Sequence, residues 1–431
     1  MRRFLSSIGF TFALLCPWVA SAQTGPSSCT TASQNLWVRD AMNEVYYWYQ
    51  FMPSGVVPTR YNSPEAYLEA VRYRPIDNSF SYITTAAASD AFYSDSQFIG
   101  YGFGNQTTAQ EIRVLQVYND SPASEAGLSR GDRIVTVNGR TVSSMVTDGT
   151  IGSAFGAADV GVASTIEWET LGGERRSARM VKRLVTIPTV SLTSVVDLEG
   201  RKVGYLFFRN FVTPSTAALT EAFEALKAAG ATELVLDLRY NGGGLVDVAV
   251  HLASLIGGAR TNGQVMLNYV HNDKLAAQFN KTTRFSNPQQ ALNLQRLVVI
   301  ATRSSASASE LVINSLRPYI PVTIIGDSTY GKPVGQYGLR FCDKILYPVA
   351  FSIKNSNFEG DFFDGLTVDC PAGDDYTHQL GDSNEASFAE ALTFLRTGAC
   401  SPRTTAERVG ALRVSPVVFT PTGWASILNA Q

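Results

Sequence analysis

Three polar residues in the second half of the chain could together carry out nucleophilic catalysis. Ser307 lies in a run of small residues, Lys332 follows it after 25 residues, and Gln336 comes four residues after the lysine. A serine hydroxyl is a weak nucleophile until a neighbouring base takes its proton, and a lysine can be that base if burial keeps its amine neutral. Gln336 could orient the amine without adding a charge. The spacing therefore indicates serine-lysine chemistry that needs no histidine.

The local pattern does not by itself single out the nucleophile, because four serines compete for the role: Ser304, Ser305, Ser307 and Ser309. The apolar run 297–302 predicts a buried strand, and a helical pattern begins near Glu310. A residue between them lies at a strand-to-helix junction, where the N–H of Ala308 would stabilise a developing oxyanion. Alone, a run of Ser and Ala is more typical of a loop or a helix cap.

The glycine run 242–244 is a second source of backbone donors. It follows the apolar strand 233–239 and leads into a predicted helix over 245–258. Consecutive glycines let the backbone approach a ligand closely, so Gly243 or its neighbour Gly244 could give the second N–H to an oxyanion. In the absence of the serine and the lysine, a tight turn would be the simpler interpretation.

Composition limits the class of protein. The chain has 431 residues, 45% hydrophobic and 17% charged, which suits a globular protein of two or three domains. A formal net charge of -2, without a long basic run, argues against nucleic acid as the main partner. The sequence has neither a phosphate-binding glycine loop nor a histidine cluster, since its three histidines lie far apart: His251, His271 and His378. The sequence therefore offers no pattern of its own for a phosphate-bearing cofactor or a histidine-bound metal.

The pattern of the first residues predicts a signal peptide over 1–22. Arg2 and Arg3 precede the apolar stretch 4–16, and Ala20-Ser21-Ala22 is a small-residue cleavage site, so the mature chain is expected to begin near Gln23. A membrane anchor is the alternative, but the apolar stretch is shorter than the roughly 20 residues that span a bilayer. We expect export to the periplasm or the extracellular space, without a membrane span after cleavage.

Loss of Cys16 with the signal peptide would leave an even number of cysteines: Cys29, Cys342, Cys370 and Cys400. In an oxidising compartment such a set favours disulfides. Of the three possible pairings, we prefer the one that joins Cys342 with Cys370 and Cys29 with Cys400, and four free buried thiols are a further alternative.

The chain divides into regions of different character. Residues 23–95 are expected to form a small helical N-terminal region, since 34–52 carries apolar residues at helical spacing. Short β-branched runs and glycine turns over 96–185 predict a β-rich domain. Strands and helices alternate over 186–400, which predicts an α/β core with a largely parallel sheet. Residues 401–431 are expected to be a tail.

The β-rich region resembles PDZ domains. The segment 120–142 matches their signature: a short helix after Pro122, glycine turns and an Asn-Gly hairpin. Upstream lies a Gly-Tyr-Gly-Phe motif formed by Gly100, Tyr101, Gly102 and Phe103. In PDZ domains the N–H groups of this loop bind the C-terminal carboxylate of a peptide, which adds to the sheet as a strand.

Over about 96–395 the chain resembles the C-terminal processing, or tail-specific, serine peptidases. The resemblance rests on 305-SASASE-310, on Gly331-Lys332 followed by Gln336, and on 237-DLRYNGGG-244. It selects Ser307 as nucleophile, Lys332 as general base and Gln336 as the orienting residue, with Gly243 and Ala308 as oxyanion donors. Gly242 stands where the family commonly has proline, which should leave that loop more flexible.

The resemblance implies an exported serine endopeptidase that cleaves proteins near their C-termini, with the PDZ-like domain binding the free C-terminal tail of a protein or peptide substrate. It implies that neither a metal nor an organic cofactor is needed. One alternative is a non-catalytic exported adaptor that holds peptide tails, and another is a hydrolase or acyltransferase acting on a small molecule. No pattern in the chain indicates a particular oligomeric state.

Overall fold

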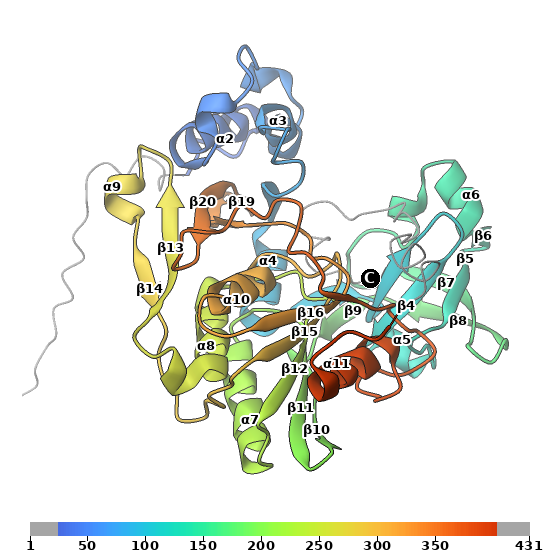
Figure 1. Ribbon diagram of the computed structural model, residues 1–431. Coiled ribbons are helices and arrows are strands. Elements are labelled where there is room, and N and C mark those ends of the chain that lie inside the picture. Colours follow the sequence, from blue (N-terminus) through green and yellow to red (C-terminus); the bar gives the residue numbers. More distant parts are fainter. Residues whose placement is uncertain (1–24, 403–431) are drawn as a thin grey trace, which may run out of the picture.

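The computed structural model describes residues 25–402 (Figure 1). The predicted signal peptide and nearly all of the predicted tail lie outside these residues. Within them, a mixed α/β fold combines an N-terminal helical region, a PDZ-like β-rich domain and an α/β core, as the sequence predicts. The predicted domain boundaries stay predictions.

The N-terminal region packs short helices around buried aromatic side chains. Its elements are α2 (Thr31–Val45), η1 (Tyr49–Phe51), η2 (Pro58–Arg60), α3 (Pro64–Val71) and α4 (Ala86–Asp95). Thr30 and Ser63 cap α2 and α3, because each side chain accepts a hydrogen bond from a first-turn N–H. Strand β1 (Tyr82–Thr85) pairs antiparallel with β19 (Lys344–Tyr347) of the core. This pairing joins the region to the segment that follows Lys332.

The PDZ domain is a curled antiparallel sheet in the order β3-β4-β5-β7-β8, with β6 paired to β5. Its elements are β3 (Phe103–Thr107), β4 (Ile112–Val117), α5 (Pro122–Glu125), β5 (Arg133–Val137), β6 (Arg140–Thr141), α6 (Val142–Thr147), η3 (Ile151–Ser153), β7 (Ala163–Glu169) and β8 (Arg175–Val181). Entry and exit strands β2 (Gln97–Gly100) and β9 (Arg183–Thr186) pair with each other. Strand β3 ends the strand order, so one of its edges has no strand partner within the described residues, although most residues of β3 are buried.

The core is built on a six-stranded sheet in the order β10-β11-β12-β15-β16-β21. Only β10 runs antiparallel to its neighbour. The strands are β10 (Val190–Leu198), β11 (Arg201–Phe208), β12 (Glu233–Asp237), β15 (Leu297–Ala301), β16 (Val322–Gly326) and β21 (Cys370–Pro371). The predicted largely parallel sheet is therefore present.

Helices cover both faces of this sheet (Figure 1). One face packs against α7 (Ser215–Ala228), α8 (Val246–Gly257) and α10 (Ala308–Leu316), and the other against α11 (Ala386–Thr397). Alternate residues of a strand reach opposite cores, as Leu236 and Val235 of β12 do. Burial on both faces explains why the strands read as continuous apolar runs.

Two smaller sheets are formed by segments that lie before or between the core strands in sequence. One has the order β14-β13-β20-β17 and the other β1-β19-β18. Their remaining elements are η4 (Gly258–Arg260), β13 (Val265–His271), α9 (Ala276–Phe279), β14 (Thr282–Arg284), β17 (Val334–Gln336), β18 (Leu339–Phe341) and β20 (Val349–Lys354). Gln336 ends β17, so these sheets place the glutamine.

The predicted disulfide pairing is wrong. The bonds are Cys29–Cys342 and Cys370–Cys400. Cys29 lies just before α2, whose Trp37 stacks on Phe341 at 4.6 Å, so Cys342 is the cysteine within its reach. Cys370 lies in β21, beside the strands on which α11 packs, and Cys400 follows that helix closely. Tertiary packing, which spacing does not reveal, decides both pairs.

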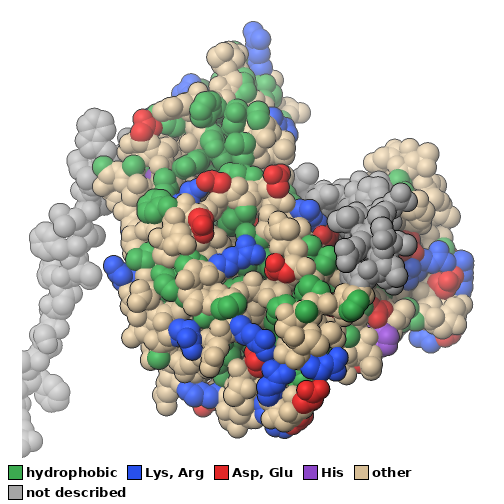
Figure 2. Space-filling view, in the orientation of Figure 1, with side chains coloured by type: hydrophobic (Ala, Val, Ile, Leu, Met, Phe, Trp, Pro, Cys, Tyr) green, Lys and Arg blue, Asp and Glu red, His purple; other side chains and the backbone are tan. Residues whose placement is uncertain are grey.

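The surface charge and the helix lengths can be compared with the expectations about net charge and a membrane span. On the face in Figure 2, acidic and basic side chains are mixed over the core, which agrees with a net charge near zero. Between residues 25 and 402, the helices are too short or too polar to cross a bilayer.

Candidate active site

Ser307 lies at the sharp turn between β15 and α10, as the strand-to-helix pattern predicts. Its backbone has φ 55° and ψ -112°, a left-handed conformation that non-glycine residues rarely adopt. The N–H of Ala308 begins the helix that follows. The turn thus presents the serine side chain at the N-terminus of α10, where negative charge is stabilised.

The surroundings of the other serines separate them from Ser307. Ser305 and Ser309 are fully buried, and their hydroxyls donate to the carbonyls of Leu238 and Asn241 at 2.7 and 2.9 Å. Ser304 does not line the cavity that Ser307, Lys332 and Gln336 share. Of the four candidates, Ser307 is the one that faces this cavity.

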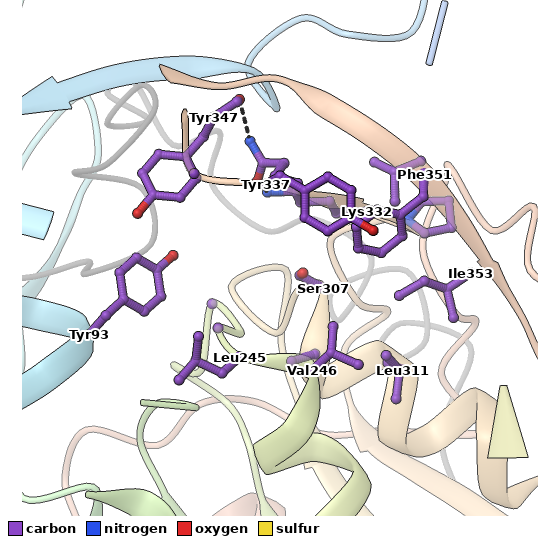
Figure 3. A pocket seen from close by; sticks show the side chains of 18 of the residues that line it. Tyr93, Leu245, Val246, Ser307, Leu311, Lys332, Tyr337, Tyr347, Phe351 and Ile353 are labelled. Carbon is purple, nitrogen blue, oxygen red and sulfur yellow. Dashed lines mark hydrogen bonds between the residues drawn. The ribbon is translucent and has the colours of Figure 1, made fainter. Parts of the chain in front are cut away.

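The shared cavity has a volume of about 420 Å³ (Figure 3). Apolar side chains form much of its wall: Leu245, Val246, Leu311, Phe351 and Ile353. In Figure 3, Tyr93 and Tyr347 lie on one side of Ser307, and Leu311, Phe351 and Ile353 lie on the other. The cavity therefore offers an apolar surface on one side of the hydroxyl and two phenols on the other.

Lys332 has a lowered pKa. Burial removes water from its amine and lowers the pKa from 10.5 to about 8, although the carboxylates of Asp77 and Glu310 act in the opposite direction. A substantial fraction of the amine is therefore neutral near pH 8, as a general base requires.

The side chain of Gln336 is held in one orientation. Its amide nitrogen donates to the carbonyls of Phe80 and Tyr347 at 2.7 and 2.8 Å. Because both partners are acceptors, Oε1 must face the other way, where it accepts from Lys332 Nζ at 2.6 Å. The glutamine thus fixes the amine without contributing a charge.

Ser307 and Lys332 face the same cavity, but they are not hydrogen-bonded to each other within the described residues. The amine instead donates to Gln336. Catalytic hydrogen bonds are often long before substrate binds and tighten in the complex.

Sequence reasoning missed Glu310, which ties the serine turn to the lysine segment. Its buried carboxylate accepts from the N–H groups of Ser307, Gly331 and Lys332 at 2.8, 2.7 and 2.8 Å. The Thr329 hydroxyl donates to it at 2.6 Å. Burial raises the pKa of Glu310, and these hydrogen bonds act against the rise. The Ser-x-x-Glu spacing of a capping box was the available signal.

The glycine run lies against the serine turn. A Cβ on Gly243 would lie 2.8 Å from Ser307 Cβ and 2.9 Å from Ala308 N, and its φ is +99°, so glycine is required. The N–H of Gly243 donates to Asn241 Oδ1 at 2.9 Å. Gly244 and Ala308 line the cavity.

In the PDZ domain, the Gly-Tyr-Gly-Phe motif joins β2 to β3. The side chains of Tyr101 and Phe103 are buried in the core of the domain, and Tyr101 donates to Ser164 Oγ at 2.9 Å. Gly102 has φ +93°, and a Cβ there would lie 2.1 Å from Ser121 Cβ. The side chains of this motif are therefore not available for binding, and all four of its residues are buried.

Three segments of the chain match models of protein families. Residues 202–363 match peptidase family S41, residues 33–82 match the N-terminal domain of S41 peptidases, and residues 113–148 match a PDZ domain.

Curated relatives are similar over more than half of the chain. The carboxy-terminal processing protease CtpA of Bacillus subtilis (strain 168) is 26% identical over 248 residues, covering 58% of this chain and 50% of the relative. A "Probable CtpA-like serine protease" of Staphylococcus aureus (strain COL) is 25% identical over 289 residues, covering 64% and 53%. The chain thus spans about half the length of these relatives.

Solved structures share the fold. A protein assigned to the S41 proteases of Bacteroides fragilis NCTC 9343 has a TM-score of 0.66 at 26% identity, covering 83% of this chain and 96% of that one. The photosystem II D1 C-terminal processing protease has a TM-score of 0.51 at 20% identity, covering 80% and 94%. At that identity, the second similarity concerns the fold alone.

Proposed function

Because this chain belongs to peptidase family S41 and carries a PDZ domain, we propose that it is an exported serine endopeptidase that cleaves proteins near their C-termini. The observation that carries the proposal is the common cavity of Ser307, Lys332 and Gln336, in which the pKa of the lysine is lowered to about 8. An adaptor that only holds tails would not need a desolvated amine beside an accessible serine hydroxyl.

In the proposed reaction, Ser307 Oγ attacks the scissile carbonyl while its proton passes to the neutral amine of Lys332. The carbonyl oxygen becomes an oxyanion. Collapse of the tetrahedral intermediate breaks the C–N bond, and the lysine ammonium protonates the departing amine. Water then attacks the acyl-enzyme, gives a proton to Lys332, and Ser307 is released with that proton restored.

The N–H of Ala308 and one N–H of the Gly243–Gly244 segment would hold the oxyanion. Ala308 has the position for this role because it begins α10 and lines the cavity. Gly243 would have to exchange Asn241 Oδ1 for the oxyanion, whereas Gly244 already faces the cavity. Gln336 would keep the lysine directed toward the substrate.

Recognition of the tail is assigned to the PDZ domain. The backbone N–H groups of Gly100, Tyr101, Gly102 and Phe103 would bind a C-terminal carboxylate, and the tail would add to the unpaired edge of β3. The partners are then proteins or peptides with free C-termini.

A direct test uses the chain from Gln23 onward with an unfolded protein that ends in an apolar tail. We expect cleavage products whose masses locate the cut near the C-terminus. A protein that binds the tail but leaves it intact would support the adaptor instead. Cleavage of small esters but not of the protein would support a small-molecule hydrolase.

A further inference from the structure

The N-terminal region has a buried carboxylate that organises a short segment next to the base. Asp77 accepts from the N–H groups of Phe80 and Ser81, both at 2.9 Å, and from the Ser81 hydroxyl at 2.6 Å. The hydroxyl of Tyr46 in turn donates to it at 2.9 Å. Four hydrogen bonds to one buried side chain fix the conformation of residues 77–81, which we call the Asp77 segment.

The Asp77 segment contacts the residues on both sides of Lys332. The Phe80 carbonyl accepts from Gln336, 256 residues away in sequence, at 2.7 Å. The Ser79 hydroxyl lies 3.0 Å from that of Tyr330, two residues before the lysine. The Phe80 ring centroid lies 5.9 Å from Lys332 Nζ. The segment therefore supplies both an acceptor for the orienting glutamine and an apolar cover for the amine.

We propose that the Asp77 segment is a positioning element of the catalytic centre. In this assignment the Phe80 carbonyl orients Gln336, the Phe80 ring keeps water from Lys332, and Asp77 holds Phe80 in place. The inference rests on the proposed function and extends it, because it gives the N-terminal region a part in catalysis.

The charges around Lys332 give the segment a measurable signature. The carboxylates that act on the amine are Asp77, from the N-terminal region, and Glu310, from α10, and both raise its pKa. Gln336 is neutral, and burial lowers the pKa. The Phe80 ring lies over the amine, with its centroid 5.9 Å from Nζ, and keeps water from that side. This distance is at the outer limit of about 6 Å for a cation–π contact, so the exclusion of water outweighs the attraction of the ring for the ammonium. Removing the ring should therefore raise the pKa of Lys332, and removing the Asp77 charge should lower it.

These two pKa changes have opposite signs, and this distinguishes a segment that positions the base from one that only supports the fold. Loss of packing alone would lower activity at every pH, without moving the pH dependence. A general base is active when neutral, so the rate rises with pH through its pKa. A higher pKa moves this acidic limb to higher pH.

The experiment compares Phe80→Ala, Phe80→Leu and Asp77→Asn with the wild-type chain. Phe80→Leu restores an apolar cover, and Asp77→Asn keeps an oxygen for the two N–H donors while removing the charge. Asp40→Asn is the control, since Asp40 lies in the same region with 65% of its side chain exposed. Thermal denaturation followed by circular dichroism reports folding. The measurements are kcat and KM against pH, and the pKa of Lys332 by NMR of ¹³C-labelled lysine, assigned with Lys332→Arg.

We expect Phe80→Ala to move the acidic limb and the Lys332 pKa upward by about one pH unit and to lower kcat more than it raises KM. Phe80→Leu should move both back toward wild-type values, Asp77→Asn should move them downward, and Asp40→Asn should move neither. Folded Phe80→Ala and Asp77→Asn proteins with the wild-type Lys332 pKa would overturn the inference. If Asp77→Asn does not fold, the inference is tested by the Lys332 pKa in Phe80→Ala and Phe80→Leu alone. If the wild type cleaves no tailed protein, the proposed function fails, and the NMR values alone decide the inference.

Discussion

The amine of Lys332 lies 2.6 Å from Oε1 of Gln336, and the amide nitrogen of Gln336 is fully used by two carbonyls. The group that accepts the hydrogen bond of the lysine amine is therefore uncharged and held in one orientation. A carboxylate in its place would stabilise the ammonium and raise the pKa of the base.

We predict that Gln336→Glu moves the acidic limb of kcat/KM upward from its wild-type position near pH 8 by about one to two units. Lys332 must lose its ammonium proton before it can act as a base. Because a higher pKa leaves less neutral amine at pH 7, activity at that pH falls most. Gln336→Ala should lose activity more mildly than Lys332→Ala. A Gln336→Glu profile that superimposes on the wild-type profile would contradict this role.

Glu310 is predicted to couple the position of the nucleophile to that of the base. In Glu310→Gln one carboxylate oxygen becomes an NH2 group, which faces either the N–H groups of Ser307 and Lys332 or the N–H group of Gly331, so donors face donors. We expect a loss of about 3 kcal/mol in the free energy of unfolding and at least a hundredfold drop in kcat. Urea denaturation and peptide hydrolysis measure the two effects. Glu224→Gln on the exposed face of α7 is the matched control and should change neither.

The PDZ loop is predicted to bind the free carboxylate of a tail. A peptide with a free C-terminus should bind at least tenfold more tightly than its amidated form, measured by calorimetry. Gly102→Ala should remove this difference, because a Cβ would lie 2.1 Å from Ser121 Cβ and force the loop to move. Gly139→Ala controls for backbone strain, since Gly139 also has a positive φ but no neighbour within 4 Å. Equal affinities of the wild type for both peptides would reject carboxylate recognition.

The two disulfides are predicted to contribute unequally to stability. Cys29–Cys342 closes a loop across 313 residues and Cys370–Cys400 one across 30. The chain-entropy model gives the longer loop about 2 kcal/mol more stabilisation. Denaturation of the Cys29→Ser/Cys342→Ser and Cys370→Ser/Cys400→Ser pairs should show the larger loss for the first pair. A larger loss for the second pair would mean that local packing outweighs loop entropy.

Features with a local signature could be predicted from the sequence. Apolar runs such as 297–302 predicted strands that are buried on both faces. The glycine spacing after Pro122 predicted the turns of the PDZ domain. The structure brings Ser307, Lys332 and Gln336 to one cavity, and their catalytic roles stay predictions.

Contacts that depend on tertiary packing could not be predicted. The acceptor for Gln336 is the backbone carbonyl of Phe80, and a carbonyl leaves no mark in a sequence. Cysteine spacing likewise did not reveal that α2 packs beside Cys342. Glu310 had a visible capping-box spacing, but its reach to the lysine segment follows only from the fold.

The central claim is that the hydroxyl of Ser307 is the nucleophile. The decisive measurement is the rate of cleavage of one tailed protein by the wild type, Ser307→Ala and Ser304→Ala, with products identified by mass spectrometry. We predict that Ser307→Ala loses cleavage by at least a thousandfold while it stays folded and still binds the tail. Ser304→Ala, which changes a serine outside the cavity, should cleave at the wild-type rate. Wild-type cleavage by a folded Ser307→Ala protein would contradict the account.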